Sequence, residues 1–227
     1  MDDRVKTGID GLDKMLSGGM LAGSINLVEG APGTGKTILA AQFLNEGLSS
    51  GESGVYLSLE EDKDSFYETM SFFGWDFKSM EGDKRFFYEY FRSEELGRHI
   101  TEGYQILDNK VMSMGAKRLV IDSVAAYILI SEKGLHERNE LLKLFDNLRK
   151  WGVTVLLTSG MPGSRDAYGI DYMVDSIIRP YYPGRTDDSS PRKRFIEVEK
   201  MRGSTHSQML HEMKITDKGI QVLGNIY

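Results

Sequence analysis

The sequence predicts an α/β fold with a mostly parallel central sheet, flanked by helices and extended by antiparallel strands at its C-terminal end. Strand-like and helix-like segments alternate over residues 24–157, which is typical of parallel strands joined by right-handed crossovers. The last quarter contains strand-like stretches without helix-length segments between them, which favours antiparallel pairing. We expect a single domain over residues 1–227, because this length fits one α/β unit.

Apolar spacing predicts the elements of the first half in order. Helices are expected over residues 9–16, 36–48 and 65–73, where apolar residues recur at helical intervals. Strands are expected over residues 24–29 and 55–59. An aromatic-rich stretch, residues 85–91, is a candidate third strand, and residues 99–114 are expected to be helical.

The second half begins with two continuous apolar runs, residues 119–122 and 153–157. Such runs are typical of strands buried on both faces of a parallel sheet. Residues 135–151 carry a broad apolar stripe and are expected to form the helix between them. Strand-like stretches follow at residues 172–179, 193–201, 209–215 and 220–223, with loops over 160–169 and 180–191.

Eight residues match the phosphate-binding pattern G-x-x-x-x-G-K-[ST]: Gly30, Ala31, Pro32, Gly33, Thr34, Gly35, Lys36 and Thr37. The glycines allow backbone N–H groups to turn toward an anion, Lys36 brings a charge to the phosphates, and the Thr37 hydroxyl can bind Mg²⁺. The pattern follows a predicted strand and opens a predicted helix that begins at Lys36 and continues through Ile38, which is the context it requires. The alternative is a glycine-rich turn with an exposed lysine.

Polar residues at three other strand ends could complete a nucleotide site. Asp122 ends an apolar strand, where a carboxylate could hold the Mg²⁺ shell or could cap a following helix. One of Glu60 and Glu61 could orient the attacking water, or the pair could be an acidic helix start. Thr158 could sense the γ-phosphate or could simply end its strand.

The stretch from Phe195 to Arg202 shows a different pattern. Alternation along a strand places Ile196, Val198, Lys200 and Arg202 on one face. A face that begins apolar and ends with two cations could reach a phosphate bound to a neighbouring subunit and stabilise transition-state charge. The alternative is a solvent-exposed strand end.

Composition narrows the classes of partner and compartment. The net charge of −6 argues against binding of duplex DNA by the whole surface. The basic run from Pro191 to Arg194 is either a solvated loop or a nucleic-acid patch, and the nearby Asp187 and Asp188 favour the loop. The chain has no cysteine, no signal-peptide pattern and no membrane-length apolar stretch. We expect a cytoplasmic protein without a membrane partner.

Taken together, these motifs resemble those of the KaiC-like branch of the RecA superfamily of ATPases, and the resemblance covers nearly the whole chain. The resembling segments occur in the family's order: residues 7–13, 18–19, 30–37, 59–61, 73–76, 119–123, 200–203 and 215–219. The resemblance implies a RecA-like P-loop core, hexameric rings, and ATP or ADP with Mg²⁺ bound between subunits.

Several roles follow from the resemblance alone. Gly33 to Thr37 would cradle the phosphates and Mg²⁺, and Glu60 would be the general base with Glu61 beside it. Lys200 and Arg202 would reach the γ-phosphate of the next subunit. Four further residues would line the neighbour's nucleotide from the same side: Ser204, His206, Thr216 and Asp217. A lone histidine beside a strand can equally be structural.

The chain also departs from the family's clock proteins. Those carry two such domains in tandem, whereas this chain has one, and their phosphoacceptor Ser-Thr pair corresponds to Asp171 and Tyr172 here. We therefore expect a slow ATPase acting on an unknown protein partner, without autokinase activity. The alternatives are a nucleotide-dependent scaffold or switch with little turnover, and an accessory protein of DNA recombination or repair.

Overall fold

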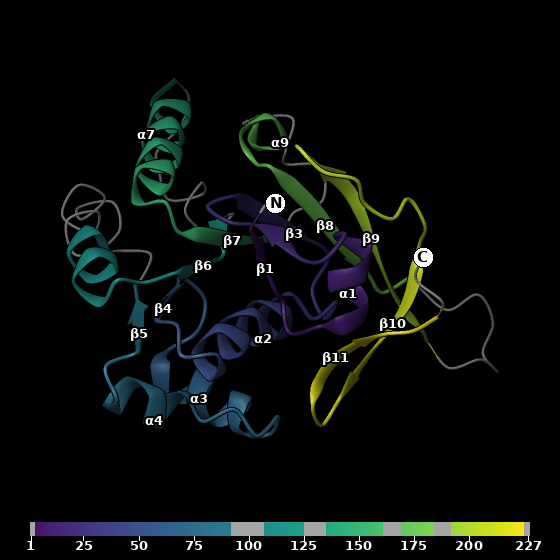
Figure 1. The fold of residues 1–227 in the computed structure, drawn as a ribbon, viewed down its shortest axis with the longest axis horizontal. Helices are drawn as coiled ribbons and strands as arrows, with labels where there is room; N and C mark the ends of the chain where they lie inside the picture. Colours follow the sequence, from purple (N-terminus) through teal and green to yellow (C-terminus); the bar gives the residue numbers. More distant parts are fainter. Residues whose placement is uncertain (1–2, 92–106, 125–134, 161–168, 184–191, 225–227) are drawn as a thin grey trace.

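The computed structural model describes residues 3–91, 107–124, 135–160, 169–183 and 192–224. Its main sheet consists of β3 (Ile25–Glu29), β4 (Gly54–Ser58), β5 (Phe86–Tyr90), β6 (Arg118–Asp122), β7 (Thr154–Ser159), β8 (Ser176–Tyr181), β9 (Arg194–Met201), β10 (His211–Thr216) and β11 (Gly219–Val222). The strand order is β11-β10-β9-β8-β3-β7-β6-β4-β5 (Figure 1). A separate small sheet pairs β1 (Arg4–Val5) with β2 (Met20–Leu21).

The predicted division of the sheet is confirmed. The strands from β8 to β5 pair in parallel, and β9, β10 and β11 are added as antiparallel neighbours. Every residue of β3, β4, β6 and β7 is buried. Burial on both faces is the reason that the middle residues of these strands are mainly apolar rather than alternating with polar ones.

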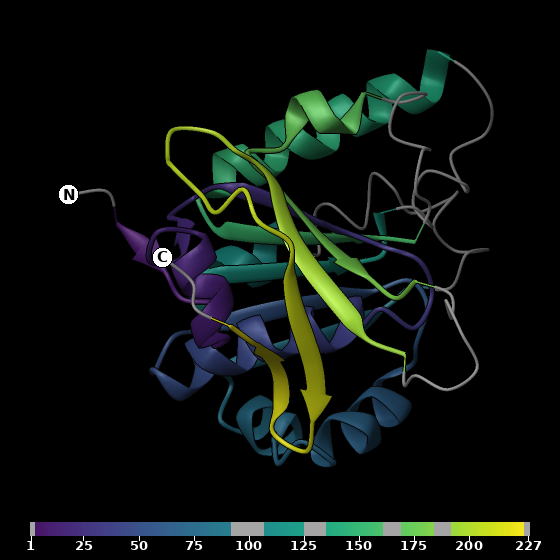
Figure 2. The ribbon, with the colours of Figure 1, turned by 90° about the vertical axis from the view of Figure 1, so that its right-hand side faces the viewer.

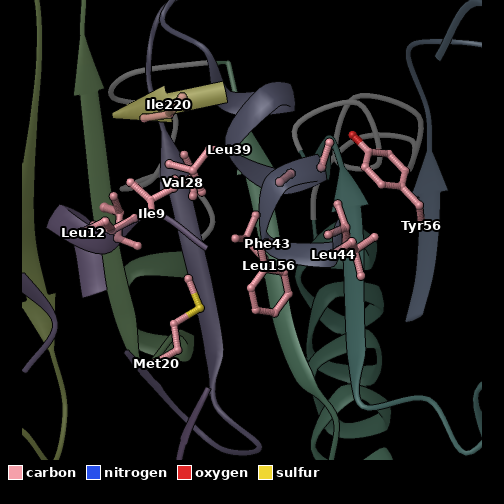
Figure 3. Close-up of a cluster of buried hydrophobic side chains, with 14 of the residues drawn as sticks. Ile9, Leu12, Met20, Val28, Leu39, Phe43, Leu44, Tyr56, Leu156 and Ile220 are labelled. Carbon is pink, nitrogen blue, oxygen red and sulfur yellow. The ribbon is translucent and has the colours of Figure 1, made fainter. Parts of the chain in front are cut away.

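Helices cover both faces of the sheet (Figure 2). They are α1 (Asp10–Met15), α2 (Lys36–Ser49), α3 (Lys63–Ser71), α4 (Phe77–Gly82), α7 (Leu135–Trp151) and α9 (Ile170–Met173), and residues 107–114 are also helical. One buried cluster joins α1, α2 and α3 to the sheet, with Leu39 and Phe43 beside Val28 and Leu156 (Figure 3). A second cluster joins α7, α9 and residues 107–116 to the opposite face.

Local chemistry explains the bounds of α3. Asp62 precedes it, and Asp62 Oδ1 accepts hydrogen bonds from the backbone N–H groups of Asp64 and Ser65 at 3.0 and 3.1 Å. These bonds satisfy donors that the first turn of a helix leaves without partners. The helix ends at Ser71, and the turn after it contains Gly74, whose positive φ of 76° favours glycine.

The structure differs from the sequence-based prediction at several points. Tyr172 and Met173 were expected in a strand but lie in α9, and β8 begins only at Ser176. The small sheet and α4 were not predicted. Of the expected helix over 99–114, residues 107–114 are helical and residues 99–106 lie outside the described part. The expected loops over 160–169 and 180–191 also lie largely outside it.

Helix length and polarity also bear on membrane insertion. None of the helices in the described ranges combines the length and apolar character that crossing a bilayer requires.

Candidate nucleotide site

The phosphate-binding pattern lies between β3 and α2, as predicted. Gly33 and Gly35 have positive φ values of 79° and 99°, which L side chains rarely adopt. A Cβ on Gly30 would lie 2.5 Å from the carbonyl oxygen of Pro180, so only glycine fits there. The loop therefore ends at the N-terminus of a fourteen-residue helix, where backbone N–H groups and the helix dipole favour an anion.

Lys36 links this loop to the acidic residues of the site. Its Nζ donates to the carbonyl oxygen of Ala31 at 3.2 Å. Burial lowers the pKa of Lys36, and the negative charges of Asp122 and Glu60 oppose that shift. Lys36 is thus close enough to both carboxylates for their charges to act on its ammonium group. A bound phosphate would add to the negative charge that keeps Lys36 protonated.

Asp122 ends β6 and is only 5% exposed. Thr158 donates a hydrogen bond to Asp122 Oδ1, and the Tyr56 hydroxyl donates to Asp122 Oδ2 at 2.6 Å. One strand, β7, lies between β6 and the loop strand β3. The structure thus brings Asp122 and Thr158 together at the carboxyl edge of the sheet, where ligands of open α/β sheets bind.

Glu60 and Glu61 follow β4 at the same edge. The Ser123 hydroxyl donates to Glu60 Oε1 at 2.5 Å. Ser123 directly follows Asp122, so the end of β6 holds the Glu60 carboxylate in place. Burial, followed by the charges of Asp122 and Asp62, raises the pKa of Glu61, although a hydrogen bond with Thr69 lowers it. Glu60 is exposed and Glu61 is half-buried. The two carboxylates differ in surroundings: Glu60 contacts Ser123, whereas Glu61 is close enough to Asp122 for that charge to raise its pKa.

The donor set suits Mg²⁺ held mainly by a nucleotide. Thr37 offers a half-buried hydroxyl in the first turn of α2, and Asp122 offers a carboxylate. Mg²⁺ prefers oxygen ligands and commonly takes one or two protein oxygens together with phosphates and water. Within the described ranges, no group of three or more His, Cys, Asp or Glu side chains could hold a metal ion by itself. The residues present therefore fit Mg²⁺ bound together with a nucleoside triphosphate.

Lys200 in β9 and Arg202 directly after β9 do not share the face that strict alternation predicts. Ile177 pairs with Lys200 while Ile178 pairs with Val198, so Glu199 is an extra residue in a β-bulge. Because of this bulge, Met201 joins Val198 in the buried cluster, and the cations turn to the other face. The prediction that Lys200 and Arg202 share a face with Ile196 and Val198 is therefore wrong.

Backbone carbonyl groups of α9 and its C-terminal end hold both cations. Lys200 Nζ donates to the carbonyl oxygens of Asp171 and of Val174, the latter at 2.8 Å. Arg202 Nη2 donates to the carbonyl oxygen of Tyr172 at 2.8 Å. These bonds fix the cations at the amino edge of the sheet, since Met201 pairs with Ser176 at the start of β8.

The remaining expected residues fall into two places. Ser204 accepts a hydrogen bond from Arg4 at 2.7 Å, and His206 Nδ1 lies 3.0 Å from the carbonyl oxygen of Ser207. Thr216 donates to the carbonyl oxygen of Gly219 at 3.0 Å, and Asp217 is exposed at the same turn. This turn joins β10 and β11, and Ile215 and Ile220 at its base lie against Gly35 of the same chain.

Cations of the basic run have partners within this chain. The guanidinium groups of Arg192 and Arg194 lie 3.7 and 4.0 Å from the ring centre of Tyr182. Arg194 also donates to the carbonyl oxygen of Gly33 in the loop at 3.2 Å, and Lys193 pairs with Glu212 at 2.7 Å. Arg192 and Lys193 are exposed, as expected for a solvated segment, whereas Arg194 lies in β9, is half-buried and contacts the phosphate loop.

Two of the hollows on the described surface can be compared with the phosphate loop. One, of about 280 Å³, adjoins the phosphate loop and is lined by Glu29, Gly30, Thr34, Arg179 and Tyr182 among others. The other, of about 490 Å³, lies between α3 and the start of α4. Only the smaller one shares residues with the phosphate loop, so volume alone does not locate the site.

The family of this chain follows from the match of its whole length. The sequence model of the family described as "ATPase: KaiC" matches residues 5–226. The chain belongs to the KaiC ATPase family. A UPF0273 protein of Pyrococcus horikoshii is 36% identical over 98% of this chain and 94% of its own length. A UPF0273 protein of Thermotoga maritima is 35% identical over 98% of this chain and 96% of its own length.

Other members of the KaiC family are similar in sequence and in structure. The circadian clock protein KaiC3 of Synechocystis is 29% identical over 97% of this chain but only 46% of its own length. The crystal structure of a KaiC-like protein from Pyrococcus horikoshii aligns with a TM-score of 0.88 and 34% identity, covering 99% of this chain and 100% of that one. The predicted resemblance and RecA-like fold are thereby confirmed.

Sequence reasoning missed three side chains that contact the site: Tyr56, Ser123 and Tyr88, whose hydroxyl donates to the carbonyl oxygen of Glu61 at 2.7 Å. Ser123 follows Asp122 directly and could have been noticed as a second polar residue at the strand end. Tyr56 lies within a strand that is buried throughout, and a buried hydroxyl normally requires a hydrogen-bond partner. That requirement was a usable signal, but only the strand order identifies Asp122 as the acceptor.

Proposed function

We propose that this protein is a slow Mg²⁺-dependent ATPase that works as a ring, most simply a hexamer, and passes its nucleotide state to a partner protein. ATP would bind at residues 30–38 of one copy, and Lys200 and Arg202 of the next copy would complete the pocket. Membership of the KaiC ATPase family supports the nucleotide-binding part. The position of the two cations supports the part that requires a second copy.

That position is the observation that carries the proposal. Gly30 follows the carboxyl end of β3, against Pro180 near the end of β8. Met201 pairs with Ser176 at the start of β8, the opposite end of the same strand. Lys200 and Arg202 are therefore separated from their own phosphate loop by about the length of a strand, roughly 17 Å. A phosphate that these cations contact would have to be bound to another copy.

The cations retain donors for such a phosphate. An ammonium group has three N–H donors and a guanidinium group has five. Two donors of Lys200 and one of Arg202 are used in the hydrogen bonds with residues 171–174. The bonds that remain available would stabilise the charge that develops on the transferred phosphoryl group.

Within the nucleotide-binding copy, the phosphate loop and Lys36 would bind the phosphates. Thr37 and Asp122 would hold Mg²⁺, which would offset the negative charge of the phosphates. Glu60, held by Ser123, would orient the attacking water and accept its proton, with Glu61 beside it. Thr158 would keep the Asp122 carboxylate in place from the adjacent strand.

A complementation experiment tests the contact between copies. Lys36→Ala removes the phosphate-binding charge and Arg202→Ala removes one cation, so each variant alone should lack turnover. In a randomly mixed ring, the intact loop of an Arg202→Ala copy meets the intact cations of a Lys36→Ala neighbour at about one interface in four. The mixture should therefore recover about a quarter of the wild-type rate.

The matched control replaces the Lys36→Ala copy by the double variant Lys36→Ala/Arg202→Ala, which should restore nothing. Native mass spectrometry would verify that the copies mix. Mixed oligomers without recovery would refute the role of the second copy. ATP binding by the wild-type protein without multiple turnover would instead indicate a nucleotide-dependent switch.

A further inference from the structure

Two buried tyrosines lie directly behind the acidic residues of the site. Tyr56, in the middle of β4, is 1% exposed, and its ring extends toward the neighbouring strand β6 (Figure 3). Its hydroxyl donates to Asp122 Oδ2 at 2.6 Å. Tyr88 of β5 stacks on the Tyr56 ring with centroids 5.3 Å apart and planes 14° apart. The Tyr88 hydroxyl donates to the carbonyl oxygen of Glu61 at 2.7 Å.

The two rings are held by a third aromatic side chain. Phe66 of α3 packs against Tyr56 at 4.6 Å and against Tyr88 at 4.8 Å between ring centroids. Packing of this kind fixes the two rings, so the hydroxyl groups have little freedom to choose other acceptors. The hydroxyl positions are therefore set by the aromatic cluster rather than by the residues that they contact.

Each hydroxyl constrains a different part of the site. The Asp122 carboxylate accepts Thr158 on Oδ1 and Tyr56 on Oδ2, and donors on both oxygens prevent rotation of the carboxylate plane. The Tyr88 bond holds the backbone at Glu61, where the chain turns from β4 toward α3. Hydrogen bonds to charged acceptors are about twice as strong as neutral ones, so the Tyr56 bond constrains more strongly.

We propose that Tyr56 and Tyr88 are positioning residues of the ATPase site: Tyr56 orients the carboxylate of Asp122 toward Mg²⁺, and Tyr88 fixes the backbone that carries Glu60 and Glu61. The stacked rings then keep the metal-holding carboxylate and the water-orienting carboxylates in a constant relation. This inference rests on the proposed ATPase function. Outer-sphere partners of this kind contribute about 10- to 100-fold to metal affinity or activity.

Conservative variants test the two roles separately. Tyr56→Phe and Tyr88→Phe each remove one hydroxyl and keep the stacked rings. Tyr67→Phe is the matched control, because Tyr67 belongs to the same aromatic cluster and its ring lies 6.1 Å from that of Tyr88. The binding readout is the affinity for a fluorescent ATP analogue, measured with Mg²⁺ and with EDTA. The second readout is the separation of kcat from KM in a multiple-turnover assay.

Tyr56→Phe should reduce the Mg²⁺-dependent gain in nucleotide affinity about tenfold and leave the affinity in EDTA unchanged. Tyr88→Phe should keep that gain and lower kcat severalfold at constant KM, while Tyr67→Phe should match the wild type. A Tyr56→Phe variant with the full Mg²⁺-dependent gain, or a Tyr88→Phe variant with wild-type kcat, would overturn the assignment of that residue.

Two further measurements keep the outcomes separate. If Tyr56→Phe melts well below the wild type, Thr158→Val provides a second test, because it removes the other donor to Asp122. Thr158→Val should reduce the same Mg²⁺-dependent gain in nucleotide affinity, and an unchanged gain would refute the positioning argument. The wild-type protein itself serves as the reference for the proposed function. If the wild-type protein shows no Mg²⁺-dependent nucleotide affinity, the ATPase proposal itself fails, whatever the tyrosine variants show.

Discussion

We expect the carboxylate of Glu29, directly before the phosphate loop, to make the free energy of unfolding depend on pH. Its side chain is 2% exposed, and Glu29 Oε2 lies 3.3 Å from Arg179 Nε. Arg179 also pairs with Glu199 at 2.8 Å. Burial raises the pKa of Glu29 to about 7, although Arg179 opposes the shift, and the charges of Asp171 and Glu199 raise it further.

The sign follows from proton binding. Between pH 4.5 and about 7 the folded protein retains a proton on Glu29 that the unfolded chain has lost, so stability falls as the pH rises through this window. At about 1.4 kcal/mol for each pH unit, the upper bound is about 3 kcal/mol. Because the side chain of Glu199 is 38% exposed, water screens the cluster, and we expect about 1–2 kcal/mol.

Glu29→Gln removes this titration and keeps the shape of the side chain. The free energy of unfolding, measured by urea denaturation at pH 5, 6, 7 and 8, should increase for the variant relative to the wild type by about 1–2 kcal/mol from the lowest to the highest pH. Glu68→Gln, which removes a carboxylate from the exposed surface of α3, is the control and should give a constant difference. A pH-independent difference for Glu29→Gln would refute the argument.

Two substitutions test the packing around the loop and the core. Gly30→Ala places a methyl group 2.5 Å from the Pro180 carbonyl oxygen, so we expect a loss of about 1–3 kcal/mol in urea denaturation and nucleotide affinity weakened at least tenfold by titration. Arg118→Met removes hydrogen bonds to Glu52 and to the carbonyl oxygens of Lys6 and Phe43, and the unfolding free energy should fall by about 3–5 kcal/mol. Wild-type stability in either variant would contradict the corresponding contact.

The sequence predicts those features that depend on residues close together in the chain. The phosphate loop is such a feature, because Gly33, Gly35 and Lys36 act through the local backbone and the helix that they open. The buried strands are another, since residues 119–121 and 155–157 are apolar throughout. In both cases the residues of the segment determine its backbone conformation without contacts from distant parts of the chain.

Features that depend on strand order could not be predicted in this way. Tyr56 meets Asp122 because β4 lies beside β6, although β5 intervenes in the chain. The bulge at Glu199 is equally invisible in the sequence, because it is defined by the pairing of β9 with Ile177 and Ile178 of β8. A single extra residue reverses the faces of all later side chains, and it moved Lys200 and Arg202 to the side of α9.

The topology also determines the kind of contact that two copies can make. A parallel strand returns to its starting edge through a helix, whereas the hairpin from β8 to β9 carries the chain straight back to the amino edge. Lys200 and Arg202 therefore lie at one edge of the sheet and the phosphate loop lies at the other. If the cations of one copy act on the phosphates of the next, the contact joins two different surfaces and is repeated by every further copy. Such head-to-tail contacts close into a ring or extend into a filament and cannot form an isolated two-fold dimer.

Native mass spectrometry with ATP should therefore give one closed stoichiometry, with six copies favoured by the family resemblance, and Arg202→Ala should weaken that assembly. A wild-type protein that stays monomeric or forms only two-fold dimers in ATP would exclude the arrangement.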